Sequence, residues 1–149
     1  MILLNDTLQL DNKNTLSHKK YIIKLARAYD QLLIKMCYSP AYVDQEKSDI
    51  LIKSCIDKYV PDFYKNSFEN INNFKVENLI TTSLKYENEY LGAYHNKTSN
   101  QEIIISPKMS SLGYISHDVL AGDYALTLSF HSVNSEITLK LLVEAKDVQ

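Results

Sequence analysis

The stretch "AGDYALTLSFHSVNSEITLKLLVEAKD", residues 121–147, decides the fold of this chain. Large apolar residues occupy every second position in its first arm, and the same pattern returns in its second arm. This alternation is typical of strands that bury one face. We therefore predict two antiparallel strands, 123–133 and 136–146, joined as a hairpin.

The register of this predicted hairpin follows from the position of its turn. With the turn centred on Asn134 and Ser135, directly opposed residues have numbers that sum to a constant. The expected opposed pairs are Phe130 with Leu139, Leu128 with Leu141, and Leu126 with Val143. Both apolar faces then coincide, and a slip of one residue would pair core positions with solvent positions. The hairpin is predicted to be one wall of a hydrophobic core.

The amino-terminal half shows a different period. Apolar side chains recur at three- and four-residue steps over 17–38, which predicts an amphipathic helix. The sequence "DILIKSCIDKYV" shows the same pattern, so a second helix is expected over 48–60. It should end before Pro61, because proline disfavours helical geometry in the residue before it. A third helix over 62–73 remains open, and its expected inward residues are Phe63 or Tyr64, Phe68 and Ile71.

Residues 75–95 support either a helix or strands. The β-branched "ITT" and the two extended arms in "EYLGAYHNKTSNQEIIISP" favour strands for the later part. Further strands are expected over 102–106 and 112–116, because two strands alone are only marginally stable.

These elements predict an α+β fold. The amino-terminal helices would pack on a carboxy-terminal antiparallel β-sheet or small β-sandwich. A chain of 149 residues has the length of one domain, 1–149, with a helical half of about 1–75 and a β-rich half of about 76–149.

Composition excludes several classes of function. The net charge is -2 with both signs interspersed, so the basic face that nucleic-acid binding requires is not expected. No apolar run is long enough for a membrane span, and no signal peptide is recognisable, so a cytoplasmic location is expected. Three glycines, three prolines, no tryptophan and many Asn, Lys and Ile residues suggest an AT-rich bacterial, phage or viral source.

The two cysteines, Cys37 and Cys55, lie near the ends of the two expected helices. A disulfide between them is geometrically conceivable, but buried thiols are favoured in a chain without a leader. No CxxC pair, Cys/His spacing, GxGxxG or GxxxxGK[ST] motif occurs. We therefore expect neither a metal nor a cofactor.

Histidine and aspartate offer one catalytic hypothesis. His117 with Asp118 or Asp123 could act as a general base, with Ser110, Ser111 or Ser116 as the nucleophile. No established nucleophile motif supports this hypothesis, and adjacent residues on a strand point to opposite faces. A metal site made of His95, His117, His131 and Asp123 lacks the short ligand spacings of structural zinc.

Tyrosine is the most informative excess, with eleven residues. Tyr86, Tyr90 and Tyr94 recur every four residues, whereas Tyr38, Tyr42, Tyr59 and Tyr64 cluster around the expected helix ends. Tyrosine is enriched at protein interfaces, although it also performs ordinary core packing. The candidate interaction surface consists of Tyr86, Tyr90, Tyr94, His95, Asn96 and Lys97.

The sequence thus favours a non-enzymatic protein-binding module, such as an inhibitor, an immunity-type antitoxin, or a secretion or assembly accessory protein. The expected partner is another protein, and self-association into a homo-oligomer stays open. A ligand- or carbohydrate-binding β-sandwich, or a virion or tail accessory module, is the alternative. A small hydrolase using His117 and Asp123 ranks third.

Overall fold

The two strands predicted at the carboxyl end are present, but they do not pair with each other. The computed structural model describes residues 1–68 and 74–147, and contains β7 at Gly122–Ser132 and β8 at Ile137–Lys146. β7 pairs with β2 and β4, whereas β8 pairs with β1 and β3. The predicted hairpin register is therefore wrong. The predicted apolar residues of β7 and β8 instead join one core from opposite sheets, and each is at most 3% exposed.

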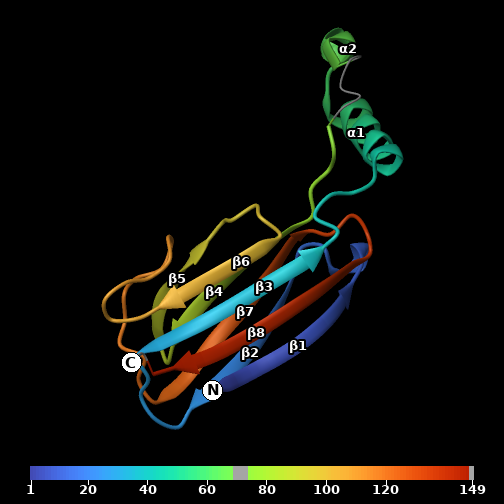
Figure 1. Ribbon diagram of the computed structural model, residues 1–149. Coiled ribbons are helices and arrows are strands. Elements are labelled where there is room, and N and C mark those ends of the chain that lie inside the picture. Colours follow the sequence, from blue (N-terminus) through green and yellow to red (C-terminus); the bar gives the residue numbers. More distant parts are fainter. Residues whose placement is uncertain (69–73, 148–149) are drawn as a thin grey trace.

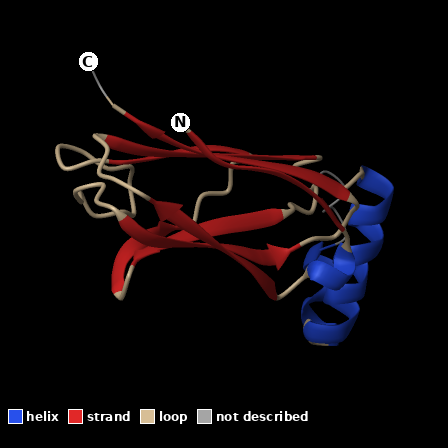
Figure 2. Cartoon of the chain, turned by 90° about the horizontal axis from the view of Figure 1, so that it is seen from below, coloured by secondary structure: helices blue, strands red, loops and turns tan. Residues whose placement is uncertain are grey.

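The described strands form two four-stranded antiparallel sheets that pack face to face (Figures 1 and 2). The first sheet has the order β1-β8-β3-β6, and the second sheet has the order β2-β7-β4-β5. Most consecutive strands lie in opposite sheets, so the chain repeatedly crosses the end of the sandwich. The expected β-sandwich is present, but strands from both halves of the sequence build it.

The helix predicted over 17–38 is wrong. This segment forms two strands, β2 at Ser17–Leu25 and β3 at Gln31–Ser39. A four-residue step, such as that from Leu32 to Met36, fits a period of two as well as a period of 3.6. Both residues are buried in β3, and the residues between them follow the strand alternation only in part. The sequence did not predict β1, at Ile2–Leu10.

The ambiguous segment 75–95 is extended. It contains β4 at Leu79–Tyr86 and β5 at Glu89–Tyr94, which pair as a hairpin. The strand expected over 102–106 is present as β6, Asn100–Ile105, but β5 and β6 belong to opposite sheets. The strand expected over 112–116 is wrong, because this segment consists of turns and isolated bridges that lie against the edge of β5.

The helices form an insertion between β3 and β4. The predicted helix 48–60 is confirmed as α1, Gln45–Tyr59, with Asp44 accepting a hydrogen bond from the Lys47 backbone N–H at its start. The third predicted helix is reduced to α2 at Asp62–Lys65 and a 3-10 turn at Asn66–Phe68, and 69–73 lie outside the described residues. These helices project from one end of the sandwich instead of covering a sheet face (Figures 1 and 2). We call residues 44–68 the helical arm.

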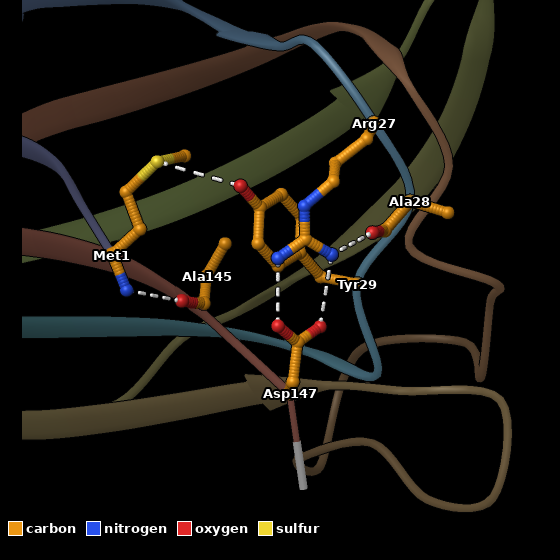
Figure 3. A network of polar contacts seen from close by, with 6 residues as sticks. All are labelled: Met1, Arg27, Ala28, Tyr29, Ala145 and Asp147. Carbon is orange, nitrogen blue, oxygen red and sulfur yellow. Dashed lines mark hydrogen bonds and ion pairs between the residues drawn. The ribbon is translucent and has the colours of Figure 1, made fainter.

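The opposite end of the sandwich carries the amino terminus and the end of β8 (Figure 1), and polar contacts close it (Figure 3). The Arg27 guanidinium donates two hydrogen bonds to the Asp147 carboxylate, at 3.1 and 2.7 Å, and lies 4.0 Å from the centre of the Tyr29 ring. The Met1 ammonium donates to the Ala145 carbonyl at 2.6 Å. The Asp147 carboxylate raises the pKa of Arg27, and the Arg27 hydrogen bonds lower the pKa of Asp147.

Cys37 and Cys55 are free and exposed, so the expectation of buried thiols is wrong. Cys37 lies on β3, and Cys55 lies on α1. Within the described residues, no helix is long and apolar enough to cross a membrane.

Candidate interaction surfaces

The residues of the tyrosine surface proposed from the sequence differ in burial and do not share one face. Tyr86 is half-buried against the core, its ring 4.8 Å from that of Tyr124, and its hydroxyl donates to the Ala121 carbonyl at 2.8 Å. Tyr90 is 54% exposed and pairs with Lys85. The four-residue spacing would place these rings on one face of a helix, but a tight turn separates β4 from β5. Tyr86 therefore offers less surface to a partner than Tyr90 does.

The rest of that surface follows β5 into the loop before β6. Tyr94 pairs with Thr82, whose hydroxyl contacts the Tyr114 hydroxyl at 2.7 Å in the interior. A bulge between the Leu84 and Lys85 pairings breaks the alternation on β5, so Tyr94 and Tyr90 do not share a face.

The three residues that follow Tyr94 differ in their contacts. His95 is exposed, and its ring centre lies 5.4 Å from that of His131. The Asn96 side-chain oxygen accepts hydrogen bonds from the backbone N–H and the hydroxyl of Thr98, both at 2.9 Å. Lys97 is exposed.

The helical arm and its immediate flanks carry a concentration of exposed large apolar side chains. Phe63 is 87% exposed, Tyr59 is 71% exposed and Phe74 is 66% exposed. Phe63 and Tyr64 contact each other edge to face, with ring centres 5.2 Å apart. The expectation that Phe63 or Tyr64 faces the core is therefore wrong, while Ile71 lies outside the described residues.

These exposed side chains form a set that we call the arm patch. Exposed apolar side chains gathered on one part of a chain suggest an interaction site, because large apolar surface is costly to leave in water. The arm patch consists of Tyr42, Ile50, Tyr59, Phe63, Tyr64, Phe68 and Phe74.

The root of the arm is firmly attached to the sandwich. Its two connecting segments run antiparallel, with Val43 N–H donating to the Val76 carbonyl at 2.8 Å and Asn78 N–H donating to the Ala41 carbonyl at 2.9 Å. Ser48, the buried residue of α1, donates its hydroxyl to the Val43 carbonyl and accepts from Val76 N–H. The arm thus begins and ends at one anchored point.

The Asn78 side chain strengthens this anchor. Its amide nitrogen donates to the Pro40 carbonyl at 3.0 Å and to the Ser135 hydroxyl at 2.8 Å, and its oxygen accepts from Asn134 N–H at 2.8 Å. One buried asparagine therefore connects both strands of the root to the link between β7 and β8.

A groove of about 430 Å³ lies between α1 and the end of the sandwich. Its walls are almost entirely apolar, and Asn134 is the polar exception among its described residues. The groove is lined by Leu51, Ile52, Cys55, Ile56, Tyr59, Val60, Phe68, Val76 and Asn134. It offers a site for an apolar side chain, and its described lining residues include no histidine or carboxylate.

The catalytic hypothesis gains no convergent geometry in the described part of the chain. The His117 Nε2 atom lies 3.5 Å from a Glu89 carboxylate oxygen, and its ring centre is 5.0 Å from that of Tyr86. Its Nδ1 atom is buried with no hydrogen-bond partner among the described residues. Asp123 contacts Lys24 instead, at 3.9 Å.

Two of the three candidate nucleophiles, Ser110 and Ser111, form hydrogen bonds from the loop that follows β6. The Ser110 hydroxyl donates to the Ile115 carbonyl at 2.9 Å, and the Ser111 hydroxyl accepts from Ile104 N–H at 2.9 Å.

The structure brings together three histidines that are far apart in the sequence. His18 on β2, His131 on β7 and His95 after β5 lie at one end of the second sheet. No group of three or more metal-ligating side chains that could hold an ion occurs within 1–68 and 74–147. The sequence contained no local signal for this cluster, because strand pairing alone creates it.

Comparison with known proteins does not assign the chain to a family. The sequence matches no family model and no curated protein.

Proposed function

We propose that this protein is a non-enzymatic binding module that captures another protein through the arm patch. The observation that carries the proposal is the contrast in burial between the core and the arm. The sandwich closes its own core, whereas aromatic side chains of the arm remain exposed at a rigidly anchored root. Aromatic side chains are the residues that most often dominate binding energy at protein interfaces.

The arm also has the charge balance that such an interface needs. Over 44–68, five acidic residues and four lysines are interspersed, so no strong field repels a partner of either sign. Apolar contact is then the main source of affinity, with the groove beside α1 as the seat for an anchoring side chain of the partner. Inhibitors, immunity-type antitoxins and assembly accessory proteins share the need to bind another protein.

The experiment is capture from the native host with the unmodified chain and three variants. The double variant F63S/F74S removes two largely exposed rings, so it should fold normally and lose the partner. The control L112S removes a 72% exposed apolar residue outside the arm and should retain the partner. Y90S tests the accessible member of the sequence-derived surface and should also retain it.

The captured protein is then purified and titrated against each version by calorimetry. We expect the arm double variant to weaken binding by at least about a hundredfold, which is typical of losing two aromatic anchors. Equal binding by F63S/F74S and L112S would overturn the proposal, and loss with Y90S alone would move the site to β5. Sedimentation of the chain alone identifies self-association, the outcome in which a second copy occupies the arm.

A further inference from the structure

The outer face of the second sheet is rich in short polar, basic and imidazole side chains. By strand alternation, short side chains fill its middle, and longer basic or imidazole side chains surround them, with Ile22 and Tyr90 as the large apolar members. The short side chains are Ala125, Thr127 and Ser129 of β7, Thr81 and Ser83 of β4, and Ala93 of β5. The surrounding ones are His18, Lys20, Lys24, Lys85, His95 and His131. We call this set of short and surrounding residues the histidine face.

Direct contacts join β2 to β7, and β7 to both β4 and the loop after β5, at one end of the histidine face. The His18 Nδ1 atom lies 3.0 Å from the Ser129 hydroxyl. The His131 Nε2 atom lies 2.8 Å from the Thr81 hydroxyl, and the His131 ring contacts that of His95. These hydrogen bonds hold the imidazoles in place, so a ligand would meet a preorganised row.

The positive charge of the histidine face is only partly compensated by neighbouring carboxylates. Lys24 has a loose contact with Asp123 at 3.9 Å, whereas no ion pair within the described residues involves Lys20 or Lys85. On the outer face of the first sheet, by contrast, Lys35 is balanced by Glu102 at 3.4 Å. The histidine face is therefore locally basic on a chain whose net charge is -2.

We propose that the histidine face binds an acidic, extended polypeptide segment, and that this binding tightens as the pH falls from about 7.5 to about 5.5. The site is separate from the arm patch and does not depend on the function proposed for it. The occupant is chosen by charge complementarity: partner carboxylates meet Lys20 and Lys85 at any pH and meet imidazolium groups when the solution is mildly acidic.

The direction of the pH dependence follows from linkage. An imidazole ordinarily gains its charge as the pH falls through the range just below neutrality. The pKa of His131 is lowered by burial and, to a smaller extent, by His95 and His18, so His131 is neutral at about pH 7.5. A bound carboxylate favours the protonated form, so binding takes up protons and is stronger at lower pH.

The other charged groups near the imidazoles do not reverse this sign. They are Lys20 and Lys24 on β2, Asp123 on β7, Lys85 on β4, Glu77 just before β4 and Lys97 after β5. Glu87 follows β4, and its carboxylate accepts a hydrogen bond from Asp123 N–H. Asp123 lies at the opposite end of the face, where it is paired with Lys24 across β2 and β7. The histidine end therefore becomes more positive as the pH falls.

The geometry favours a peptide over a nucleic acid. Three lysines supply too little fixed charge for a phosphate backbone, whose binding proteins commonly make about six to ten phosphate contacts. Alternate residues of an extended peptide repeat at about 6.6–7 Å, which matches the spacing of Lys20 from His18 along β2. A peptide that lies along the strands can thus present one carboxylate to each cationic position.

The test uses a rhodamine-labelled peptide of about twelve alternating Asp and Ser residues, whose carboxylates stay ionised at about pH 5.5. Fluorescence anisotropy should show binding on the order of tenfold tighter at the lower pH than at about pH 7.5, and weaker binding in high salt. H18Q/H95Q/H131Q should lose this gain, and K20Q/K85Q should bind more weakly at both pH values.

Three controls make the outcome decisive. H117Q removes the one histidine outside the face and should keep the full pH response. H18Q alone, which removes only an exposed contact, should lose part of the gain even if the triple variant folds poorly. F63S/F74S should bind the peptide normally, so failure of the arm proposal leaves this one intact.

The proposal is overturned if the pH response survives in H18Q/H95Q/H131Q, or if the peptide does not bind at the lower pH. It is also overturned if a single-stranded DNA oligonucleotide or a sulfated glycan of equal charge binds more tightly than the peptide, because the occupant is then another polyanion.

Discussion

The sandwich and the helical arm treat large apolar side chains in opposite ways. In the sandwich, the inner faces of both sheets bury their large apolar side chains almost completely, and the end that carries the amino terminus is closed by Arg27, Tyr29 and Asp147 (Figure 3). In the arm, the largest aromatic side chains remain exposed to the solvent. Burial in a core explains the first region, and the exposed rings of the second region are the basis of the proposed binding function.

The largest expected effect contrasts one residue from each region. Leu139→Ala should destabilise the protein by about 2–5 kcal/mol, because it removes buried methyl groups and leaves a cavity between the sheets. Phe63→Ala should change the free energy of unfolding by no more than about 0.5 kcal/mol. Urea unfolding of both variants measures the difference. A cost for Phe63→Ala similar to that of Leu139→Ala would mean that the arm packs as part of the core.

A smaller effect is expected at the root, where the two regions join. Asn78→Ala should cost about 2–3 kcal/mol, since Pro40, Ser135 and Asn134 lose their hydrogen-bond partner in a buried site. Amide hydrogen exchange should accelerate at 41–43 and 76–78. The exposed Asn5→Ala on β1 is the control and should leave both measurements unchanged. Unaltered exchange in Asn78→Ala would show that backbone pairing alone holds the arm.

Removing the arm sharpens the comparison further. Replacing residues 44–75 by a short Gly-Ser link should leave the sandwich folded, at a cost of only about 1 kcal/mol. The two root segments already lie within hydrogen-bond distance, so closing the loop is inexpensive, and the main anchoring interactions that the deletion removes are the hydrogen bonds of Ser48. Circular dichroism should lose its helical signal and keep its strand signal. An unfolded product would show that the arm is needed for stability.

The sequence predicted strands best where alternation was unambiguous. The apolar positions of β7 and β8 are correct, but their pairing is not, because two strands alternate identically whether they share a sheet or face each other across a core. The four residues between β7 and β8, 133–136, determine that the two strands lie in opposite sheets. Val133 is buried, and its backbone N–H donates to the Thr15 hydroxyl at 3.0 Å instead of closing a hairpin turn. Such long-range contacts have no local sequence signal.

The candidate sites were predictable only in part. The period of α1 was visible, yet periodicity implied a buried face and could not show that the arm extends beyond the sandwich. The histidine face was invisible, because His18 and Ser129 meet only through the pairing of β2 with β7. The tyrosine spacing in 86–94 was misleading, since it assumed a helix where a strand pair and a bulge occur.

The smallest expected effect tests how two of the four edge strands, β1 and β2, are joined across the sandwich. Asp6 on β1 accepts a hydrogen bond from the Tyr21 hydroxyl on β2 at 2.7 Å, and Lys19 lies 3.6 Å from the same carboxylate. The Tyr21 hydrogen bond is the main cause that lowers the pKa of Asp6 below its ordinary value of 3.8, with Lys19 assisting. A lowered pKa in the folded state means that the contribution to stability is present above pH 3.8 and is lost as the pH falls further.

Urea unfolding at about pH 7 and about pH 3 should therefore show a smaller acid-induced loss of stability in Asp6→Asn than in the unmodified protein. Tyr21→Phe should reduce the loss in the same direction, because it removes the hydrogen bond and leaves mainly Lys19 and the Thr7 backbone N–H to hold the carboxylate charged. Both sites are near the surface, so solvent screens the effect and keeps it below the other three. An acid-induced loss equal in all three proteins would mean that the two edges are joined by backbone connection and core packing, without help from this pair.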